Sequence, residues 1–336
     1  MTHHVHLRHQ QGIASRHQQG AALLMALLTI SLIAVLASAA LWQQWRTLSV
    51  ETAERDAQQA HWLLAGAQDW ARVVLREDAR AGSTDHLAEP WATTLREARL
   101  SSFLAATPGG TLNLSDGLAE QVFLSGRITD LQSRLNVNSL VVQGQLQALE
   151  YQSFERLYQA LGLPPAELSQ WSAALVAAQQ TPPKPQAPLP PQRLEQLSWL
   201  GLSAKSLARL SPHITVLPNV TPVNLNTASA AVLFASVPSL TQAQAQTWVR
   251  ERSQHPFESL EDVRTRMGPA ARGLSDTRHS VGTRYFEVVG QLRQPQVTVL
   301  ERSLVVRDGT EAKTIWRERR ALKGEPGCLS TIDPPC

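Results

Sequence analysis

The residues best placed for chemistry lie beside the first apolar stretch of the chain. A leader containing histidine and arginine ends in His17-Gln18-Gln19-Gly20, and no charged side chain follows from Ala21 to Gln44. A secretory signal is cut after its apolar region, whereas glycine directly before the run indicates a cut between Gly20 and Ala21. At roughly 1.5 Å per helical residue, the run is long enough to cross the roughly 30 Å core of a bilayer. We therefore expect one transmembrane helix that stays in the mature protein.

A second cleavage pattern lies near the far end of the same run. Ala37-Ser38-Ala39 has the A-x-A form that a signal peptidase cuts, and a cut after Ala39 would release a soluble periplasmic protein. The sequence beyond Ala39 keeps a helical pattern, which favours a continuing helix over a new amino terminus. The cut after Gly20 is therefore preferred, and release after Ala39 is the alternative.

The two cysteines of the chain are both close to its end. In an oxidising compartment Cys328 and Cys336 could pair and close a short loop that contains Pro334 and Pro335. Two free thiols are the alternative. The spacing and the lack of further ligands exclude a zinc or CxxC redox site.

One short segment contains the residue types of a hydrolase. Ser275, Asp276 and His279 are neighbours in sequence, but catalytic triads are assembled across a fold, and no nucleophile-elbow motif surrounds this serine. The chain also has no Walker loop, no G-x-G-x-x-G and no H-E-x-x-H motif. A charge-paired turn is the preferred interpretation, and no enzymatic activity is expected.

A possible nucleic-acid module begins at Pro222-Val223-Asn224-Leu225-Asn226-Thr227-Ala228. The following pattern of two helices joined by residues 237–241 is similar to a helix-hairpin-helix unit, with Asn226 or Thr227 placed to cap the first helix. DNA-gripping hairpins use glycine so that backbone N–H groups can approach phosphate, and residues 237–241 contain none. Local charges nearly cancel, and the net charge of the chain is only +3. Packing or protein recognition is favoured, and a competence-type DNA-binding protein is the alternative.

The rest of the pattern predicts an α+β protein. Apolar residues recur at three- and four-residue steps from Trp45 to Val74, so the membrane helix should continue as an amphipathic spine. Strand patterns occur at residues 121–131 and again after Thr283, where an Asp308-Gly309 pair predicts a hairpin turn. Helical periodicity and a proline-rich spacer lie between them. The expected segments are a leader 1–20, a transmembrane part 21–44, a spine helix 45–82, a loop with the first strands 83–132, a helical insertion 133–275, and C-terminal strands with a tail 276–336.

The leader, its glycine and the apolar run resemble those of type IV pilin-like prepilins. In that family a prepilin peptidase removes the leader on the cytoplasmic face, the new amino terminus is usually methylated, and the fifth mature residue is usually glutamate. Here the fifth residue is Met25. The K minor pseudopilins of type II secretion systems typically lack this glutamate. Segments 128–138 and 85–92 also resemble that family.

This resemblance implies both a fold and a function. The fold is a pilin-like long N-terminal helix packed on a small antiparallel sheet, with a large all-α insertion, SAM-like or helix-hairpin-helix-like, between strands. The function is to initiate and cap the pseudopilus that exports folded proteins across the outer membrane. The implied partners are the I and J minor pseudopilins, the inner membrane, the prepilin peptidase and secreted cargo. The chain would cross the inner membrane once, with its amino terminus in the cytoplasm and its bulk in the periplasm.

The resemblance also implies calcium, because K subunits are associated with this ion in their globular region. Calcium requires hard oxygen ligands, and the sequence has no EF-hand-like run of spaced acids. Asp276, Glu287 and Asp308 are the candidate ligands. Calcium is therefore a candidate cofactor without an assigned ligand set.

Overall fold

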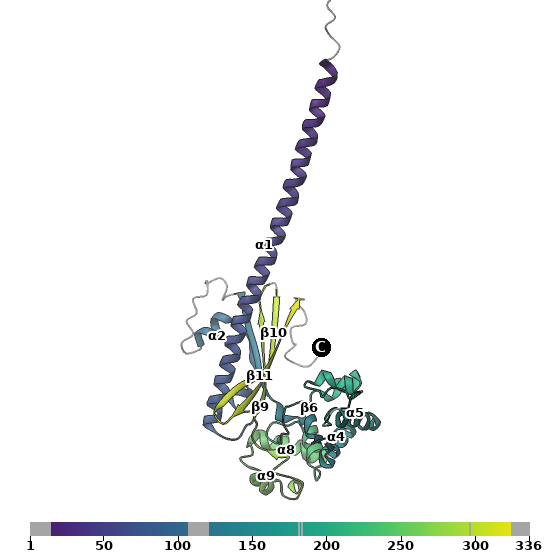
Figure 1. Cartoon of the computed structure of the whole chain (residues 1–336). Helices are drawn as coiled ribbons and strands as arrows, with labels where there is room; N and C mark the ends of the chain where they lie inside the picture. Colours follow the sequence, from purple (N-terminus) through teal and green to yellow (C-terminus); the bar gives the residue numbers. More distant parts are fainter. Residues whose placement is uncertain (1–14, 107–120, 181, 183, 296, 324–336) are drawn as a thin grey trace, which may run out of the picture. The chain divides into compact units, whose positions relative to one another are not determined.

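The protein, seen here in a computed structural model, is described for residues 15–106, 121–180, 182, 184–295 and 297–323 (Figure 1). It consists of two units, Met1–His61 and Trp62–Cys336. The boundary between them falls inside one helix, α1 (Ser15–Ala81). No proline interrupts this helix, and the next proline, Pro90, begins the short 3-10 helix η1 (Pro90–Ala92).

The second unit contains a five-stranded antiparallel sheet. Its order is β1-β2-β9-β10-β11, so the pairing of β2 with β9 joins segments more than 150 residues apart in sequence. A hairpin through Asp308 and Gly309 connects β10 to β11, as the sequence predicts. The strands are β1 (Leu95–Arg99), β2 (Phe123–Asp130), β9 (Tyr285–Arg293), β10 (Val297–Asp308) and β11 (Glu311–Lys323).

The later part of α1, from Trp62 onwards, packs on one face of this sheet (Figure 1). Its buried residues Leu64, Gln68, Ala71 and Leu75 recur at three- and four-residue steps. A Cβ added at Gly290 of β9 would lie 3.3 Å from the Leu64 side chain, so glycine permits this close approach. The helix α2 (Leu100–Ala106) follows β1.

The chain leaves the sheet after β2 and returns to it at β9, and the intervening segment forms the helical insertion. Its helices are α4 (Ala148–Leu161), α5 (Pro165–Ala178), α6 (Ala204–Leu210), α7 (Ala230–Ser236), α8 (Gln242–Gln254) and α9 (Leu260–Met267). Its 3-10 helices are η2 (Leu131–Ser133), η3 (Val137–Ser139), η4 (Leu194–Leu200) and η5 (Gly268–Ala271). Three pairs of two-residue strands add to it, namely β3 (Leu135–Asn136) with β6 (Ile214–Thr215), β4 (Val141–Val142) with β5 (Gln145–Leu146), and β7 (Val223–Asn224) with β8 (His279–Ser280).

The predicted α+β class with a helical insertion between strands is therefore confirmed. One detail of the prediction is wrong, because neither Asn226 nor Thr227 caps α7. The Ser229 hydroxyl accepts from the Val232 N–H and takes that role. Asn226 instead accepts from the Phe257 N–H at 2.9 Å and donates to the Phe257 carbonyl at 2.9 Å, which joins two loops of the insertion.

Candidate assembly surface

The first part of α1 has the composition of a membrane span. Among the described residues, Gly20–Ala81 contains a window of mean hydropathy 2.5, and none of that window is buried. By length and composition this helix is able to cross a membrane. Gly20 and Ala21 lie within the helix, and Met25 is 66% exposed on its surface. A helix that is apolar on all sides requires lipid or other apolar helices around it.

The part of α1 that packs on the sheet also has an exposed side. Trp62 is 73% exposed, Trp70 43% and Val73 39%, and Gly66 lies between the two tryptophans at four-residue steps. A Cβ added at Gly66 would meet no atom of the described part of the chain within 4 Å. We call Trp62, Gly66, Trp70 and Val73 the outer face of α1. It is an apolar helical surface with room for a close neighbour.

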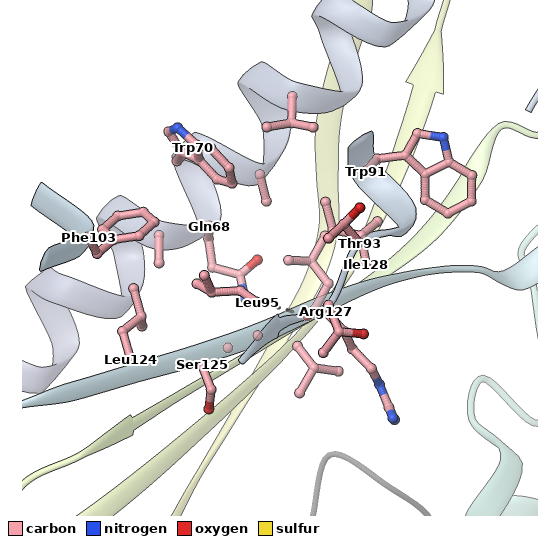
Figure 2. Close-up of a pocket in the computed structure, with 18 of the residues that line it drawn as sticks. Gln68, Trp70, Trp91, Thr93, Leu95, Phe103, Leu124, Ser125, Arg127 and Ile128 are labelled. Atoms are coloured by element: carbon pink, nitrogen blue, oxygen red, sulfur yellow. Dashed lines mark hydrogen bonds between the residues drawn. The ribbon is translucent and has the colours of Figure 1, made fainter. Parts of the chain in front are cut away.

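An apolar groove lies beside this face, between α1 and strands β1 and β2. Its volume is about 480 Å³. Figure 2 shows Trp70 and Phe103 on one side and Trp91 and Ile128 on the other. Trp70 and Phe103 meet edge to face at 5.7 Å between ring centroids, and Trp91 meets Phe286 in the same way at 5.2 Å. The aromatic pairs give the groove rigid walls.

A buried polar contact holds α1 in register on the sheet. Gln68 is 2% exposed, accepts from the Ser303 hydroxyl at 2.6 Å, and donates to the Val288 carbonyl. An amide buried among apolar residues needs such partners, since an unpaired one would cost about 1–3 kcal/mol. Sliding of α1 along the sheet would break both bonds, so the outer face is presented in one position.

The connection between sheet and insertion is a polar network around Arg307. Its guanidinium donates to both oxygens of Asp85 at 2.5 and 2.6 Å and to Asp78 at 2.6 Å. The guanidinium also lies 4.9 Å from the centre of the Phe286 ring. Burial raises the pKa of Asp85 to about 7, while the charge of Arg307 limits the rise. Arg307 thus joins the end of β10 to the chain that follows α1.

The same network continues into the insertion through Asn224. Its side-chain amide donates to the Asp85 carbonyl at 3.0 Å and to the Asp130 carboxylate at 2.9 Å. Asp130 also accepts from the Thr227 hydroxyl at 2.5 Å and from the Gln132 N–H at 2.7 Å. Burial raises the pKa of Asp130, and these hydrogen bonds oppose the rise. We call Asp78, Asp85, Asp130, Asn224 and Arg307 the junction network.

The three candidate calcium ligands do not come together. Asp276 pairs with Arg264 at 2.6 Å, and Asp308 with Arg284 at 2.9 Å, both near the surface. Glu287 is buried and accepts two bonds from Arg302. These three residues therefore do not form a ligand set, because each carboxylate is neutralised by a different arginine on a different part of the fold.

Another group of acids has the right spacing for a metal ion. Ligand atoms of Asp78, Asp85 and Glu89 lie within 4.8 Å of one another. The sequence contained a partial signal, since Asp85 and Glu89 are four residues apart, but Asp78 comes from α1. The Arg307 guanidinium already lies against Asp78 and Asp85, and Glu89 accepts from the Trp91 indole N–H. Asp78 and Asp85 thus already bind a cationic side chain and Glu89 an indole N–H, so the three carboxylates do not fit calcium.

The Ser275, Asp276 and His279 segment is a structural turn. His279 Nδ1 accepts from the Ser275 backbone N–H at 3.0 Å, so the opposite nitrogen donates to the Ser236 carbonyl at 3.2 Å. Burial lowers the pKa of His279 to about 4, which keeps the ring neutral. The Ser275 hydroxyl contacts Thr277, and Asp276 lies in its ion pair with Arg264. The three side chains do not form a relay.

The hairpin between α7 and α8 uses part of its backbone N–H groups internally. The Val237 N–H donates to the Leu233 carbonyl and the Leu240 N–H to the Val237 carbonyl. Arg156 binds the Phe234 and Leu240 carbonyls from inside the insertion. Gly273 packs close to the hairpin, since a Cβ added there would lie 3.0 Å from Pro238. The N–H groups of Val237 and Leu240 are therefore already used within the chain and are not available to a phosphate.

Two predicted features have no structural test here. Cys328 and Cys336 lie outside the described residues, so their pairing stays a prediction. The cut between Gly20 and Ala21 is also a prediction, although both residues are described within α1.

Comparisons with known proteins all point to one protein family. Two family models, both described as type II secretion system protein K, match residues 133–219 and 223–282. The chain is 30% identical to type II secretion system protein K of Klebsiella pneumoniae over 275 residues, covering 73% of this chain and 78% of that protein. It is 27% identical to the protein of the same name from Pseudomonas aeruginosa over 321 residues, covering 85% and 90%.

A solved structure matches the fold. It is a chain in the crystal structure of the GspK–GspI–GspJ complex of the enterotoxigenic Escherichia coli type 2 secretion system. The TM-score is 0.59 at 18% sequence identity, with coverage of 81% of this chain and 98% of that chain. At this identity the likeness concerns the fold alone.

Proposed function

The chain belongs to the type II secretion system protein K family, and on this premise we propose that it initiates and caps the tip of the pseudopilus. Members of this family are minor pseudopilins that act in protein secretion as structural subunits. The proposed partners are the I and J minor pseudopilins, since the solved relative belongs to a complex of those three subunits. In this role the subunit would help to drive export of folded proteins across the outer membrane.

The proposed position at the tip rests on the apolar residue Met25 at the fifth position after the proposed cut. Pilin-like subunits usually have a glutamate there, which is thought to meet the terminal amine of the neighbouring subunit inside the filament. A carboxylate in hydrocarbon is costly without such a partner. A terminal subunit has no further amine to meet, so an apolar residue at this position fits the end of a filament. Met25 lies on an exposed, uncharged helix surface.

The outer face of α1 and the neighbouring groove supply the proposed contact with the other subunits. Both are apolar, and Gln68 holds the helix that carries them in one register. The insertion follows β2 and precedes β9, so it enlarges the sheet unit without interrupting α1. This bulk is the proposed obstacle to adding another subunit beyond the tip.

Processing and topology follow from the same proposal. The prepilin peptidase would cut between Gly20 and Ala21 on the cytoplasmic side of the inner membrane. The apolar part of α1 would then remain as a single-pass anchor, with the sheet and insertion in the periplasm. Contact with secreted cargo is part of the proposal for the insertion.

The mature amino terminus tests the processing step. Intact-mass analysis of the chain purified from membranes is expected to give a polypeptide that begins at methylated Ala21. A Gly20→Asp variant should retain the leader, while a Gly82→Asp control should be processed normally. A mature chain that begins after Ala39 would rule out the anchored subunit.

The contact with neighbouring subunits is tested at Gly66. A Gly66→Gln variant places bulk on the outer face of α1, where an added Cβ meets no atom of the described residues within 4 Å. We expect at least a tenfold loss of co-purification with the I and J subunits, with unchanged thermal unfolding of the chain alone. Gly82→Gln, at an equally open position beyond the helix, is the control. Equal recovery of the partners with both variants would exclude this face as the interface.

A further inference from the structure

A second groove lies between the insertion and β11, the strand at one edge of the sheet. Its volume is about 620 Å³, and Leu304, Ile315 and Trp316 line it from the last two strands. Leu304 precedes Val305, which packs under α1, and neighbouring residues of a strand point to opposite faces of the sheet. This groove is therefore on the side of the sheet opposite α1, apart from the groove of Figure 2.

The lining of this second groove is uncharged. All of the described residues around it are apolar residues, prolines or amides. Val220 of the insertion is 56% exposed and Ile315 is 44% exposed, so apolar side chains in the groove remain in contact with solvent. Exposed apolar side chains that gather in a groove mark a site for another apolar group. The groove therefore suits a segment that is mostly uncharged and includes apolar residues.

The edge of β11 beside this groove is open in the described part of the chain. β11 is the last strand in the order of the sheet, and it pairs with β10. Apart from that pairing, no backbone group from Glu311 to Lys323 takes part in a backbone hydrogen bond among the described residues. An edge strand of 13 residues offers a row of N–H and C=O groups to a further strand. A segment that pairs with this edge would satisfy those groups.

The residues that follow β11 have a composition that suits both features. We call residues 324–336, which lie outside the described part of the chain, the C-terminal segment. It begins with Gly324-Glu325-Pro326-Gly327, a short loop sequence with two glycines, and residues 328–333 include the β-branched pair Thr331-Ile332. Pro334-Pro335 comes next, and proline ends a strand because it has no N–H to donate. The order is that of a hairpin loop, a short strand and a stop.

The length of the C-terminal segment matches the distance to the groove. At about 3.3 Å per residue, Trp316 lies about 23 Å back along β11 from Lys323. Residues 328–336, running antiparallel beside β11 after the loop, would cover about 30 Å. Pairing of Cys328 with Lys323 would bring Pro335 beside Trp316, so the two prolines would reach the groove.

The charges of the edge and of the C-terminal segment are complementary. Residues 311–321 of β11 have four basic and two acidic side chains. The buried Glu301 of β10 pairs with two of those arginines and offsets one of the two excess positive charges. The C-terminal segment has two acids and no basic residue. A net positive edge would therefore meet a net negative segment.

We propose that residues 328–333 add a sixth strand to the sheet, antiparallel to β11, and that Pro334 and Pro335 bind in the groove against Trp316. Binding of proline to an aromatic side chain is a recurrent way to hold an extended segment. The C-terminal segment would cover the open edge and keep it from pairing with other chains, so that assembly contacts stay on the outer face of α1. The position of the segment does not depend on the proposed role at the pseudopilus tip.

This arrangement predicts the state of the two cysteines. Cys328 and Cys336 would lie about 26 Å apart along an extended strand, whereas a disulfide needs Cα atoms within about 7 Å of each other. The proposal therefore requires two free thiols. A disulfide between the two cysteines would prevent the segment from lying along β11.

Cross-linking of the full-length chain in detergent tests the position of the C-terminal segment. With Cys328→Ser, Cys336 is the one remaining native cysteine, and Ile315→Cys adds a second cysteine in the groove. Oxidation with copper phenanthroline should join Cys336 to position 315 within one chain, and peptide mass spectrometry identifies the link. Val73→Cys, at an exposed position of α1 across the sheet, is the matched control and should react at least about tenfold more slowly.

Two further measurements use the native sequence. The chain purified without reductant should contain two thiols that react with DTNB after denaturation. Hydrogen exchange of the β11 amides should be at least about tenfold faster in a chain that ends at Lys323 than in the full chain, while β9 stays protected in both. A synthetic peptide of residues 324–336 should restore protection of β11 in the shortened chain.

Three results would each overturn the proposal: equal cross-linking from positions 315 and 73, equal exchange of β11 with and without the C-terminal segment, or a disulfide between Cys328 and Cys336 in the purified chain. Protection of β11 that appears only at high chain concentration, or only with the I and J subunits, would assign this edge to a strand of another molecule instead. The cross-linking result decides the matter even where the shortened chain does not fold.

Discussion

The helical insertion and the sheet are stabilised in different ways. The insertion has one continuous apolar cluster that extends from Leu135 to Ala271 and includes Trp171 and Phe257, both fully buried. Among the described residues the sheet has smaller apolar clusters, including one under α1 and one around Leu304, and further buried apolar side chains such as Leu64, Leu124 and Leu292. Buried polar groups lie between and beside them, including Glu301, which pairs with two arginines of β11.

The two regions therefore have different structural roles, stability in the insertion and positioning of α1 on the sheet. A continuous apolar core supplies stability without strict geometric demands, because hydrophobic burial is not directional. Buried ion pairs and amides contribute less net stability but tolerate few arrangements, so we infer that they set how α1 lies on the sheet. The insertion thus forms the larger core, and the sheet positions the helix whose outer face is the proposed assembly contact.

The largest loss of stability is expected from a substitution in the core of the insertion. Trp171 packs edge to face on Phe154 and donates its indole N–H to the Tyr158 hydroxyl at 2.8 Å. Trp171→Ala should lower the free energy of unfolding by about 3–5 kcal/mol. Hydrogen exchange should accelerate in α4 and α5 while β9 and β10 stay protected. Trp199→Ala, at a tryptophan that is 58% exposed, is the control and should change little.

The second-largest loss of stability is expected in the junction network, which lies outside both apolar cores. Arg307→Met leaves Asp78 and Asp85 without their cation, and removing one partner of a buried pair should cost about 3 kcal/mol. Protonation of Asp85 limits the loss. Arg284→Met, at an exposed ion pair with Asp308, should cost less than about 1 kcal/mol. Equal losses in chemical denaturation for the two variants would contradict a special role for the junction.

A third comparison lies within the insertion, between Asn226 and Ser229. Asn226→Ala leaves the buried N–H and carbonyl of Phe257 unpaired and should cost about 2 kcal/mol. Ser229→Ala removes the cap of α7 and should cost about 1 kcal/mol. Urea unfolding of the two variants measures the difference. The reverse order would mean that the cap matters more than the tie between loops.

The pH dependence is a gradual effect, at most about 1.4 kcal/mol per pH unit for each group. Because the pKa of His279 is lowered to about 4, its contribution to stability is present above pH 6.5 and is lost as pH falls through 4. Because the pKa of Asp85 is raised to about 7, its contribution declines as pH rises from about 4 to 7. The two regions should therefore respond to pH with opposite signs.

Two substitutions check these signs by thermal unfolding across pH 4 to 8. His279→Gln should make the insertion less sensitive to acid, and Asp85→Asn should flatten the decline toward neutral pH. Hydrogen exchange assigns each change to its region. Identical pH profiles of the wild type and both variants would show that neither group titrates as its burial implies.

Local patterns were sufficient for several elements. Helical periodicity between the two strand patterns indicated a helical insertion, which contains α4 and α5, and Asp308-Gly309 indicated the turn between β10 and β11. The strand β1 had no such signal, because Leu95–Arg99 consists mostly of charged residues and pairs at the edge of the sheet. Its structure depends on a partner strand rather than on its own composition.

What the sequence by itself determined is the uncharged helix that is long enough to span a membrane, the α+β class and the family, because these rest on composition and on order along the chain. Only the tertiary structure decided the partners of buried charges and amides: that Arg307 holds Asp78 and Asp85, and that Asn226 joins loops instead of capping α7. The physical reason is that a charge or amide is satisfied by whichever group lies within about 3 Å, and long-range strand pairing sets which groups those are.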